Sequence, residues 1–378
     1  LGPMAARRQQ QGAEREHDKS IATGRRHVRC HYNEPMSEID ARVAQLREWL
    51  CSGLGRPIDG LALAAGDASF RRYFRAHGDG TTWIVMDAPP GHEDIRPYLK
   101  VSRLLEETGV HVPHVHASDI EQGFVLLEDL GSTPYLARLA RGEDVDRLYG
   151  DALGALAAIQ VRGRDAAREL PPYDDRALQR ELDLMPEWFC ARHLRLALDD
   201  EELALIVRTF DFLVEEVLAQ PRVFVHRDYH SRNLMVVAQD NPGIIDFQDA
   251  LEGPLGYDLV SLLKDCYVAW PRARVTAWLR EYRRRIAREG LAAGASEREF
   301  LRWFDLAGVQ RHLKVLGIFS RLWYRDGKRG YLADLALTLD YVRDACARYS
   351  ELQAFAHWVE ARIVPALPAA NARELALR

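Results

Sequence analysis

Asp228, Asn233 and Asp246 are the residues of this sequence whose types and spacing best fit a chemical role. They lie within the stretch VFVHRDYHSRNLMVVAQDNPGIIDFQD, residues 223–249. An Asp, an Asn five residues later and a further Asp after a strand are typical of sites that transfer a phosphoryl group from ATP. In this interpretation Asp228 is the base that orients and deprotonates the attacking hydroxyl. Asn233 and Asp246 bind Mg²⁺, which prefers oxygen ligands.

Three short apolar runs, at 222–225, 234–237 and 243–247, predict the elements that hold these residues. A short loop after the first run brings Asp228 and Asn233 to one side, and a hairpin return delivers Asp246 beside them. His226 is expected to support the loop by hydrogen bonding. The competing interpretation is a β-hairpin with ordinary turn Asp and Asn residues. These three residues in this order and spacing are much rarer than single Asp or Asn residues in turns, which favours the functional interpretation.

Further charged residues lie near this stretch. Asp249 follows the expected metal ligand by three positions, so it borders either the acceptor site or a second metal. Asp258 is at a predicted helix start, where a carboxylate bonds backbone amides, and we expect it to brace the catalytic loop. Arg227 and Arg232 flank the base, and the sequence does not decide which of them contacts phosphate or acceptor.

Composition indicates a globular protein of ordinary type. The sequence is 47% apolar and 28% charged. Its 378 residues are enough for two domains or one large bilobal domain. A formal charge of −5 argues against nucleic-acid and anionic-membrane partners. No apolar run approaches the roughly 18 residues of a membrane span, and no signal peptide is recognisable. The five cysteines are dispersed, which is typical of reduced thiols in the cytoplasm.

The order of patterns predicts a small α+β lobe followed by a mostly helical lobe. Residues 1–36 are polar and are expected to be a disordered tail that begins with the remnant of a protease site, so the native start is either Met4 or Met36. The N-lobe is expected at 37–130, with a helix from Ser37, strands at 61–65, 70–76, 83–88 and 124–127, a helix at 93–108 and an edge strand at 111–118. The C-lobe is expected at 131–378. Two apolar stripes predict core helices there, Val145/Leu148/Ala152/Leu156/Ile159 and Leu203/Ile206/Val207/Phe210/Leu213/Val214/Val217.

The strings HRDYHSRNLM and IDFQDALEGPLGYDLVSLL resemble the aminoglycoside phosphotransferase family, which is related to protein kinases. The resemblance covers residues 37–360. It implies a bilobal protein-kinase-like fold, the cofactors ATP and Mg²⁺, and transfer of the γ-phosphoryl group to a small-molecule hydroxyl.

Longer strings resemble one branch of that family. GDASFRRYF, IVMDAPP and QRHLKVLGIFSRLWYRDGKRGYLADL are similar to the anomeric kinases for N-acetylmuramate and N-acetylglucosamine. The resemblance implies phosphorylation of the anomeric oxygen of an amino sugar in bacterial peptidoglycan recycling. Its product would feed a uridylyltransferase, with no physical contact expected between the two enzymes.

The nucleotide site is expected in the N-lobe. The turn that contains Gly66 and Ser69 has small side chains, so its backbone N–H groups can approach phosphates. The segment 128–130, which begins at Glu128 and ends at Leu130, is the expected interlobe hinge. Its backbone groups are expected to pair with the adenine edge. Ordinary hairpin turns and strand ends show the same local patterns.

One position departs from the family pattern. Kinases of this type place a lysine on the third strand to bind the α and β phosphates, and that position holds Met86 here. Either an arginine, Arg72 or Arg75, replaces the lysine, or the loop backbone and metals suffice. The third alternative is a non-catalytic nucleotide- or sugar-binding pseudokinase.

Charged residues late in the sequence indicate which kind of acceptor the site would bind. Arg311 and Lys314 can share one helix face and favour a neutral or anionic acceptor, such as a sugar with a lactyl carboxylate. A solvated helix face is the competing interpretation. An aminoglycoside antibiotic, the alternative acceptor, would need a cleft lined by carboxylates. The late acidic residues are dispersed.

Overall fold

The computed structural model describes residues 38–54, 58–66 and 70–376. The expected tail, Ser69 and the rest of its turn at 67–69 lie outside these residues. The chain divides into two compact units, residues 1–45 and 46–378.

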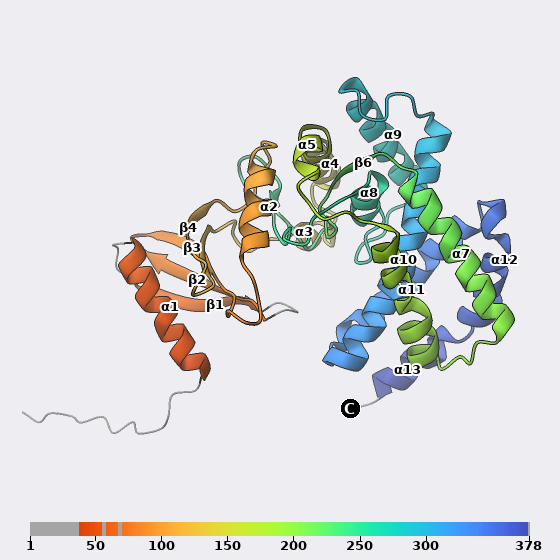
Figure 1. Ribbon diagram of the computed structural model, residues 1–378, viewed down its shortest axis with the longest axis horizontal. Helices are drawn as coiled ribbons and strands as arrows, with labels where there is room; N and C mark the ends of the chain where they lie inside the picture. The colour runs from red at the N-terminus through yellow and green to blue at the C-terminus, as the bar shows by residue number, and fades with distance from the viewer. Residues whose placement is uncertain (1–37, 55–57, 67–69, 377–378) are drawn as a thin grey trace, which may run out of the picture. The chain divides into compact units, whose positions relative to one another are not determined.

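An antiparallel sheet of five strands forms the N-lobe, in the order β1-β2-β3-β5-β4 (Figure 1). Its elements follow an N-terminal helix and include one helix between the third and fourth strands: α1 (Glu38–Leu54), β1 (Gly60–Gly66), β2 (Arg72–Gly78), β3 (Thr81–Asp87), α2 (Arg96–Glu106), β4 (Val115–Asp119) and β5 (Phe124–Glu128). The expected β-rich lobe is therefore confirmed. Helix α2 begins at Arg96 rather than at residue 93, with Pro97 in its first turn, where no backbone N–H is needed.

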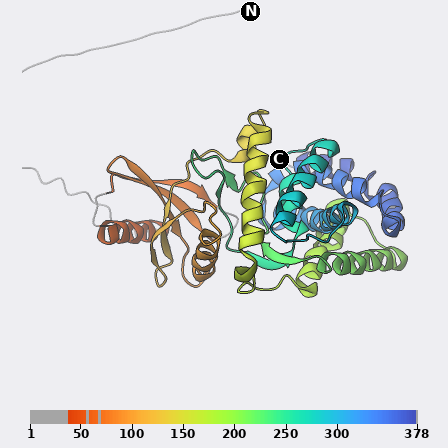
Figure 2. The ribbon, with the colours of Figure 1, turned by 90° about the horizontal axis from the view of Figure 1, so that it is seen from above.

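The remaining described chain is mostly helical, as expected. Its elements are gathered in the yellow-to-blue part of the ribbon (Figure 1; Figure 2). They are α3 (Tyr135–Leu139), α4 (Val145–Arg162), α5 (Arg164–Ala167), α6 (Asp175–Leu182), η1 (Met185–Leu194), α7 (Asp200–Leu218), β6 (Arg222–Val225), β7 (Leu234–Met235), β8 (Gly243–Ile244), β9 (Leu251–Pro254), α8 (Gly256–Leu263), α9 (Arg272–Arg288), α10 (Glu297–Asp326), η2 (Arg329–Asp334), α11 (Leu335–Cys346), η3 (Ser350–Leu352), α12 (Gln353–Trp358), η4 (Val359–Ile363) and α13 (Leu367–Ala376).

Strands β6 to β9 form two pairs of strands rather than a single hairpin. β7 and β8 form the expected hairpin, but β6 pairs with β9, a strand that the sequence did not indicate. β9 begins two residues after Asp249. The stretch that carries Asp228 is therefore held by two separate two-stranded ladders, one formed by the strands at its two ends, β6 and β9, and one formed by β7 and β8 within it.

The apolar stripe of α4 is buried throughout, but that of α7 is narrower than predicted. Ile206, Phe210, Leu213 and Val217 are buried. Leu203 and Val207 are exposed, so their prediction as core residues was wrong. A seven-residue stripe spans too wide an arc of a helix for all of its members to face one core.

Helix α10 is the long element that carries Arg311 and Lys314. It begins at a capping box, in which Ser296 accepts the N–H of Glu299 while the Glu299 side chain accepts the N–H of Ser296. It ends at Gly327, whose φ of 69° is the left-handed conformation that terminates helices. Because both ends are fixed, its buried middle positions hold charged side chains in defined places.

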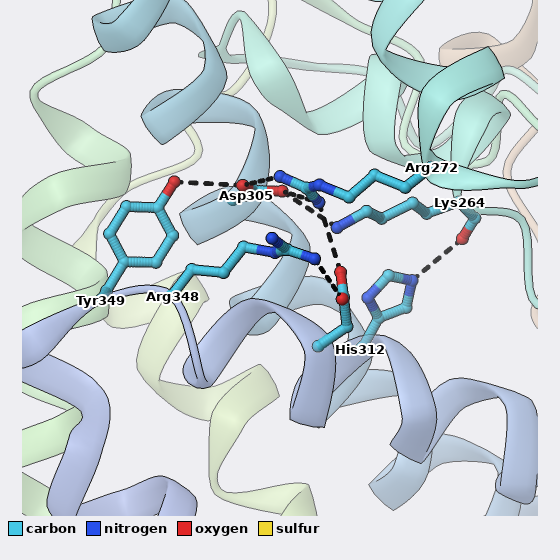
Figure 3. A network of polar contacts seen from close by, with 7 residues as sticks. Lys264, Arg272, Asp305, His312, Arg348 and Tyr349 are labelled. Atoms are coloured by element: carbon cyan, nitrogen blue, oxygen red, sulfur yellow. Dashed lines mark hydrogen bonds and ion pairs between the residues drawn. The ribbon is translucent and has the colours of Figure 1, made fainter.

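A polar network joins the end of α8 to α9, α10 and the segment that follows α11 (Figure 3). Lys264 Nζ lies 3.0 Å from Asp305 Oδ1, and Arg272 lies 2.8 Å from Asp305 Oδ2. Tyr349 also donates to Asp305 at 3.1 Å. Asp305 and Lys264 are buried, and burial works against the charge of Asp305. Lys264 and Arg272 nevertheless hold its pKa below the usual range.

No helix in the described part of the chain is long and apolar enough to cross a membrane.

Candidate active site

The loop that carries Asp228 is braced by carboxylates from both ends of α8. Asp258 accepts the backbone N–H groups of His226 at 2.7 Å and Arg227 at 3.0 Å. Asp265, two residues after α8, accepts the N–H of Ser231 at 3.0 Å and also its hydroxyl. Since α8 is almost entirely buried, these bonds fix the loop relative to the helical core.

The backbone of Asp228 is held on both sides. Its N–H donates to Nδ1 of His226 at 3.3 Å, and its carbonyl accepts from Asn233 at 3.1 Å and from the N–H of His230 at 3.0 Å. Burial lowers the pKa of His226 to about 4, so its ring is neutral at pH 7 and Nδ1 can accept that bond. The side chain of Asp228 lines a cavity.

The Asp228 carboxyl is ionised at neutral pH. Burial opposes the charge, but the nearby ring of His230 and the cations Lys314 and Arg311 outweigh it and lower the pKa. A charged carboxylate next to a cavity is the state that a proton acceptor needs.

Asn233 and Asp246 are in direct contact. The amide of Asn233 donates to Asp246 Oδ2 at 3.1 Å, and Gln248 donates to Asp246 Oδ1 at 2.9 Å. Asp246 has a φ of 65°, a backbone conformation that costs energy for a non-glycine residue and clusters at functional sites. It turns the carboxylate toward Asn233 directly after the β7–β8 hairpin.

These two side chains fit a magnesium site. The Asn233 amide oxygen and the Asp246 carboxylate are hard donors, and both residues line the cavity that contains Asp228. Within the described residues no group of three or more His, Cys, Asp or Glu side chains forms a closed metal site. Mg²⁺ does not need one, because it is commonly bound by one or two protein oxygens together with water and substrate phosphates.

The first cavity has a volume of about 1130 Å³ and lies beside Asp228. Asp249, Arg311 and Lys314 line it together with the catalytic residues. Lys314 lies 2.9 Å from both Glu181 and the hydroxyl of Tyr257. The cations on its wall are Arg180, Arg227, Arg232, Arg311, Lys314 and Arg321.

Arg311 is a buried cation of this wall that pairs with no carboxylate among the described residues. Only 5% of the residue is exposed, and it donates a long hydrogen bond of 3.9 Å to Cys266 Sγ. Its Nε has no partner among the described residues. Burial opposes its charge, yet Cys266, Tyr257 and Asp228 keep its pKa raised, so a guanidinium ion lies buried at the cavity wall.

The second cavity, of about 430 Å³, reaches from the N-lobe sheet to Asn233 and Asp246. Glu128 and Leu130 line it. Gly243 of β8 lies directly against Leu130, because a Cβ at Gly243 would be 2.8 Å from Leu130 Cδ1. This close contact joins the hinge to the catalytic hairpin. The two cavities share Asn233 and Asp246 and so meet at the expected metal ligands.

The structure corrects the expectation for Arg72. Tyr73 and Arg75 of β2 line the second cavity, and Arg72 alternates to the opposite face of the sheet, where it pairs with Asp87 at 2.5 Å. Arg75 lines the cavity but is bound to Asp129 and to the carbonyl of Gly131. Gly66 ends β1 opposite Arg72. Ser69 lies outside the described residues.

Two residues that hydrogen-bond or pair with residues of the site were not predicted from the sequence. Asp265 braces the loop, and its spacing of seven from Asp258, two helical turns, was the available signal. Glu181 pairs with Arg227 at 2.6 Å and with Lys314. Burial opposes its charge, but these cations lower the pKa of Glu181. It lies in a helix remote in sequence, so no local pattern indicated it.

The sheet, hinge and braced catalytic loop define a kinase-like fold, and solved structures share it. An ethanolamine kinase from Plasmodium vivax superposes with a TM-score of 0.56 at 13% identity, covering 80% of this chain and 87% of its own. A choline kinase from Streptococcus pneumoniae has a TM-score of 0.56 at 14% identity, covering 82% of this chain and 100% of its own.

The family model described as "Phosphotransferase enzyme family" matches residues 60–317. An N-acetylmuramate/N-acetylglucosamine kinase from Pseudomonas aeruginosa is 50% identical over 323 residues, 83% of this chain and 94% of the relative. A protein of the same name from Neisseria meningitidis serogroup B is 43% identical, over 82% of this chain and 93% of its own. The chain belongs to the phosphotransferase enzyme family, and the family resemblance noted in the sequence is confirmed.

Proposed function

We propose that this chain transfers the γ-phosphoryl group of ATP to the anomeric hydroxyl of N-acetylmuramate or N-acetylglucosamine. The observation that carries the proposal is the charged cavity beside Asp228, in a chain that is 50% identical to a kinase named for these two sugars. Asn233 and Asp246 would hold Mg²⁺, which supplies positive charge against the phosphates.

The residues of the chain perform the other steps. Asp228 accepts the proton of the sugar hydroxyl. Hydrogen bonds hold the backbone of Asp228 in place, so its carboxylate orients that hydroxyl. Glu128 and Leu130 border the adenine end of the second cavity, which meets the first cavity at the expected metal ligands. The attacking oxygen and the transferred group thus approach from different cavities, as in-line transfer requires.

Charge in the first cavity supports a neutral or anionic acceptor over an aminoglycoside. Outside the expected catalytic and metal-binding residues and Asp249, its acidic residues already have partners: Asp174 caps α6, Glu181 binds Lys314 and Arg227, and Asp265 braces the loop. Arg311, in contrast, pairs with no carboxylate in the described chain. A sugar carboxylate would satisfy this buried guanidinium. Lys314 and Asp249 line the same cavity and would contact sugar hydroxyls.

Phosphorus NMR tests the reaction and its position together. Protein incubated with Mg-ATP and either sugar should give ADP and a sugar 1-phosphate. The methyl glycoside of N-acetylglucosamine, which has no free anomeric hydroxyl, should give neither product above background. Phosphorylation of the glycoside would contradict the anomeric assignment. Consumption of an aminoglycoside instead of the sugars would favour the antibiotic-modifying alternative, and the absence of any acceptor-dependent ADP would favour the pseudokinase.

The role of Arg311 is tested separately, by comparing KM for the two sugars. Arg311→Met should raise KM for N-acetylmuramate more than KM for N-acetylglucosamine, because only the former carries the carboxylate. Arg325→Met is the matched control, since Arg325 lies on the same helix but is exposed and pairs with Asp326. Equal changes for both sugars would remove Arg311 from carboxylate recognition.

A further inference from the structure

Three described residues line both cavities of the site: Arg232, Asn233 and Asp246. Asn233 and Asp246 are the expected metal ligands. Arg232 is the third member of this set, and of the described cations it alone lines both cavities. A group that moves from a nucleotide in one cavity to an acceptor in the other passes the place where the two cavities meet. Arg232 is therefore the cation at that junction.

The other arginines of these walls are bound to carboxylates or line one cavity only. Arg227, which lies on the other side of the base in sequence, pairs with Glu181 at 2.6 Å and lines the first cavity alone. Arg75, the second cation on the wall of the second cavity, is bound to Asp129 at 2.6 Å. The structure therefore distinguishes the two arginines that flank the base, which the sequence did not.

Aromatic rings hold the guanidinium of Arg232 by its face. Its Cζ lies 3.6 Å from the centroid of the Tyr267 ring and 5.5 Å from that of Tyr331. A ring stacked on a guanidinium restricts its plane but takes none of its N–H donors, which lie at the edge.

The N–H edge of Arg232 has no protein partner in the part of the chain that the structure describes. The side chain is exposed, and it neither donates a hydrogen bond nor pairs with a carboxylate among these residues. Arg232 acts on Asp334 electrostatically, but burial outweighs this and keeps the pKa of Asp334 raised. The donors of Arg232 can therefore bind a ligand at the junction.

The ring under Arg232 is fixed by the same carboxylate that braces the catalytic loop. Asp265 accepts the backbone N–H of Tyr267 at 3.1 Å through one oxygen and that of Ser231 at 3.0 Å through the other. The Tyr267 ring also stacks on Phe319 of α10, with centroids 6.2 Å apart. Both the loop that carries Arg232 and the ring on which it lies are thus tied to Asp265.

We propose that Arg232, positioned by Tyr267, binds the γ-phosphoryl group of the nucleotide and remains in contact with it during transfer. The transferred group carries charge on its three equatorial oxygens, and the planar fork of a guanidinium matches phosphate oxygens. This inference rests on the proposed function, because it takes the second cavity as the ATP site and the first as the acceptor site.

The transfer itself leaves Arg232 unchanged. The sugar oxygen forms a bond to the γ phosphorus, and the bond from that phosphorus to the β,γ-bridging oxygen breaks. The bridging oxygen keeps the bonding electron pair and leaves as part of ADP, while the hydroxyl proton passes to Asp228. Arg232 keeps its own protons throughout and supplies only positive charge and hydrogen bonds.

Calorimetric binding of two ligands, each with Mg²⁺, tests the inference without any acceptor. One is the ATP analogue with an imido group between the β and γ phosphorus atoms, and the other is ADP, which lacks the γ group. Arg232→Met should weaken binding of the analogue by about 10- to 100-fold, the effect of a charge-assisted contact, and leave ADP binding within about twofold. Arg232→Lys, which keeps the charge but not the fork, should recover part of the loss.

Arg192→Met is the matched control. Arg192 is also an exposed arginine whose guanidinium lies over an aromatic ring, 5.4 Å from the centroid of Trp188, and it is not among the described residues that line either cavity. This variant should bind both ligands like the wild type.

Two results would overturn the role of Arg232. One is unchanged binding of the analogue in Arg232→Met. The other is an equal loss of analogue and ADP, which would indicate a general defect of the nucleotide site. The proposed acceptor fails separately: a wild-type protein that binds the analogue but phosphorylates neither sugar would contradict it, whereas a selective loss of the analogue in Arg232→Met would still support the role of Arg232.

A double-variant cycle tests the positioning by Tyr267. Tyr267→Leu should weaken binding of the analogue less than Arg232→Met does, with ADP binding again within about twofold. The double variant should be no weaker than Arg232→Met alone, since the two residues act through one contact. Strictly additive losses would show that Tyr267 does not act through Arg232.

Discussion

The carboxylates of Asp258 and Asp265 hold opposite ends of the loop that carries Asp228. Asp258 accepts two backbone N–H groups where the loop begins, and Asp265 accepts the N–H and hydroxyl of Ser231 where it turns toward Asn233. Both come from the buried helix α8 and the residues just after it. The position of Asp228 is therefore set by the helical core.

Asp265→Asn should lower kcat with little change in KM for ATP. An amide cannot accept through both of its polar atoms, so one of the bonds to Ser231 or Tyr267 is lost and the loop shifts. A misplacement of about 1 Å can cost about 10²-fold in rate. Steady-state kinetics measure the effect, and Asp344→Asn, an exposed carboxylate on α11, is the control. An unchanged kcat would show that this brace is dispensable.

Asp228→Asn should nearly abolish turnover while the fold is preserved. Loss of a general base costs roughly 10²- to 10⁴-fold in kcat. The same change at Asp240, in an exposed turn with a left-handed backbone that Asn tolerates, should leave kcat unchanged. Acceptor-dependent ADP release measures both variants, and circular dichroism checks the fold. Wild-type turnover in Asp228→Asn would refute Asp228 as the base.

Asp305→Ala should destabilise the protein strongly. It leaves the buried ammonium of Lys264 without its partner, which typically costs about 3–5 kcal/mol. Glu360→Ala removes an exposed pair with Arg343 and should cost less than about 1 kcal/mol. Urea unfolding compares the two variants. Similar losses would mean that the network in Figure 3 contributes no more than a surface pair.

Replacement of His312 should change how stability depends on pH. Burial lowers the pKa of His312 to about 3, and its Nε2 lies 2.9 Å from the carbonyl of Lys264. An unfolded histidine has a pKa of about 6.5, so between about pH 6.5 and 3 only the unfolded state takes up this proton. Stability from a neutral His312 is present above about pH 6.5 and falls progressively as the pH decreases through that window.

Thermal unfolding of wild type and His312→Gln across that pH range measures this contribution. The difference in Tm between the two proteins should shift in favour of the variant as the pH falls. A difference that stays constant with pH would contradict a neutral buried His312.

The positions of the expected catalytic and metal-binding residues were predictable because they lie in one contiguous motif. Asp228, Asn233 and Asp246 are placed by one loop and one hairpin, so local spacing carries most of the information. Strand β9 and Glu181 were not predictable, because their partners are distant in sequence and depend on packing.

The wrong assignment of Arg72 has a different cause. The run RRYFR contains polar and aromatic residues at both strand parities, so its alternation does not reveal which face each side chain takes. The register with β3 decides it, and places Tyr73 opposite Met86. The exposed Leu203 and Val207 show the same limitation for a helix, since apolar residues at the margins of a stripe are not separated by pattern from those at its centre.

Met86 also affects chemical labelling. Nucleotide analogues with an amine-reactive group find their target in a kinase-type fold at the lysine of the third strand. This chain has a thioether there, on the fully buried side chain of Met86. Such reagents should leave β3 unmodified, because no lysine lies in this strand. Inhibitors that depend on capture of that lysine would spare this enzyme.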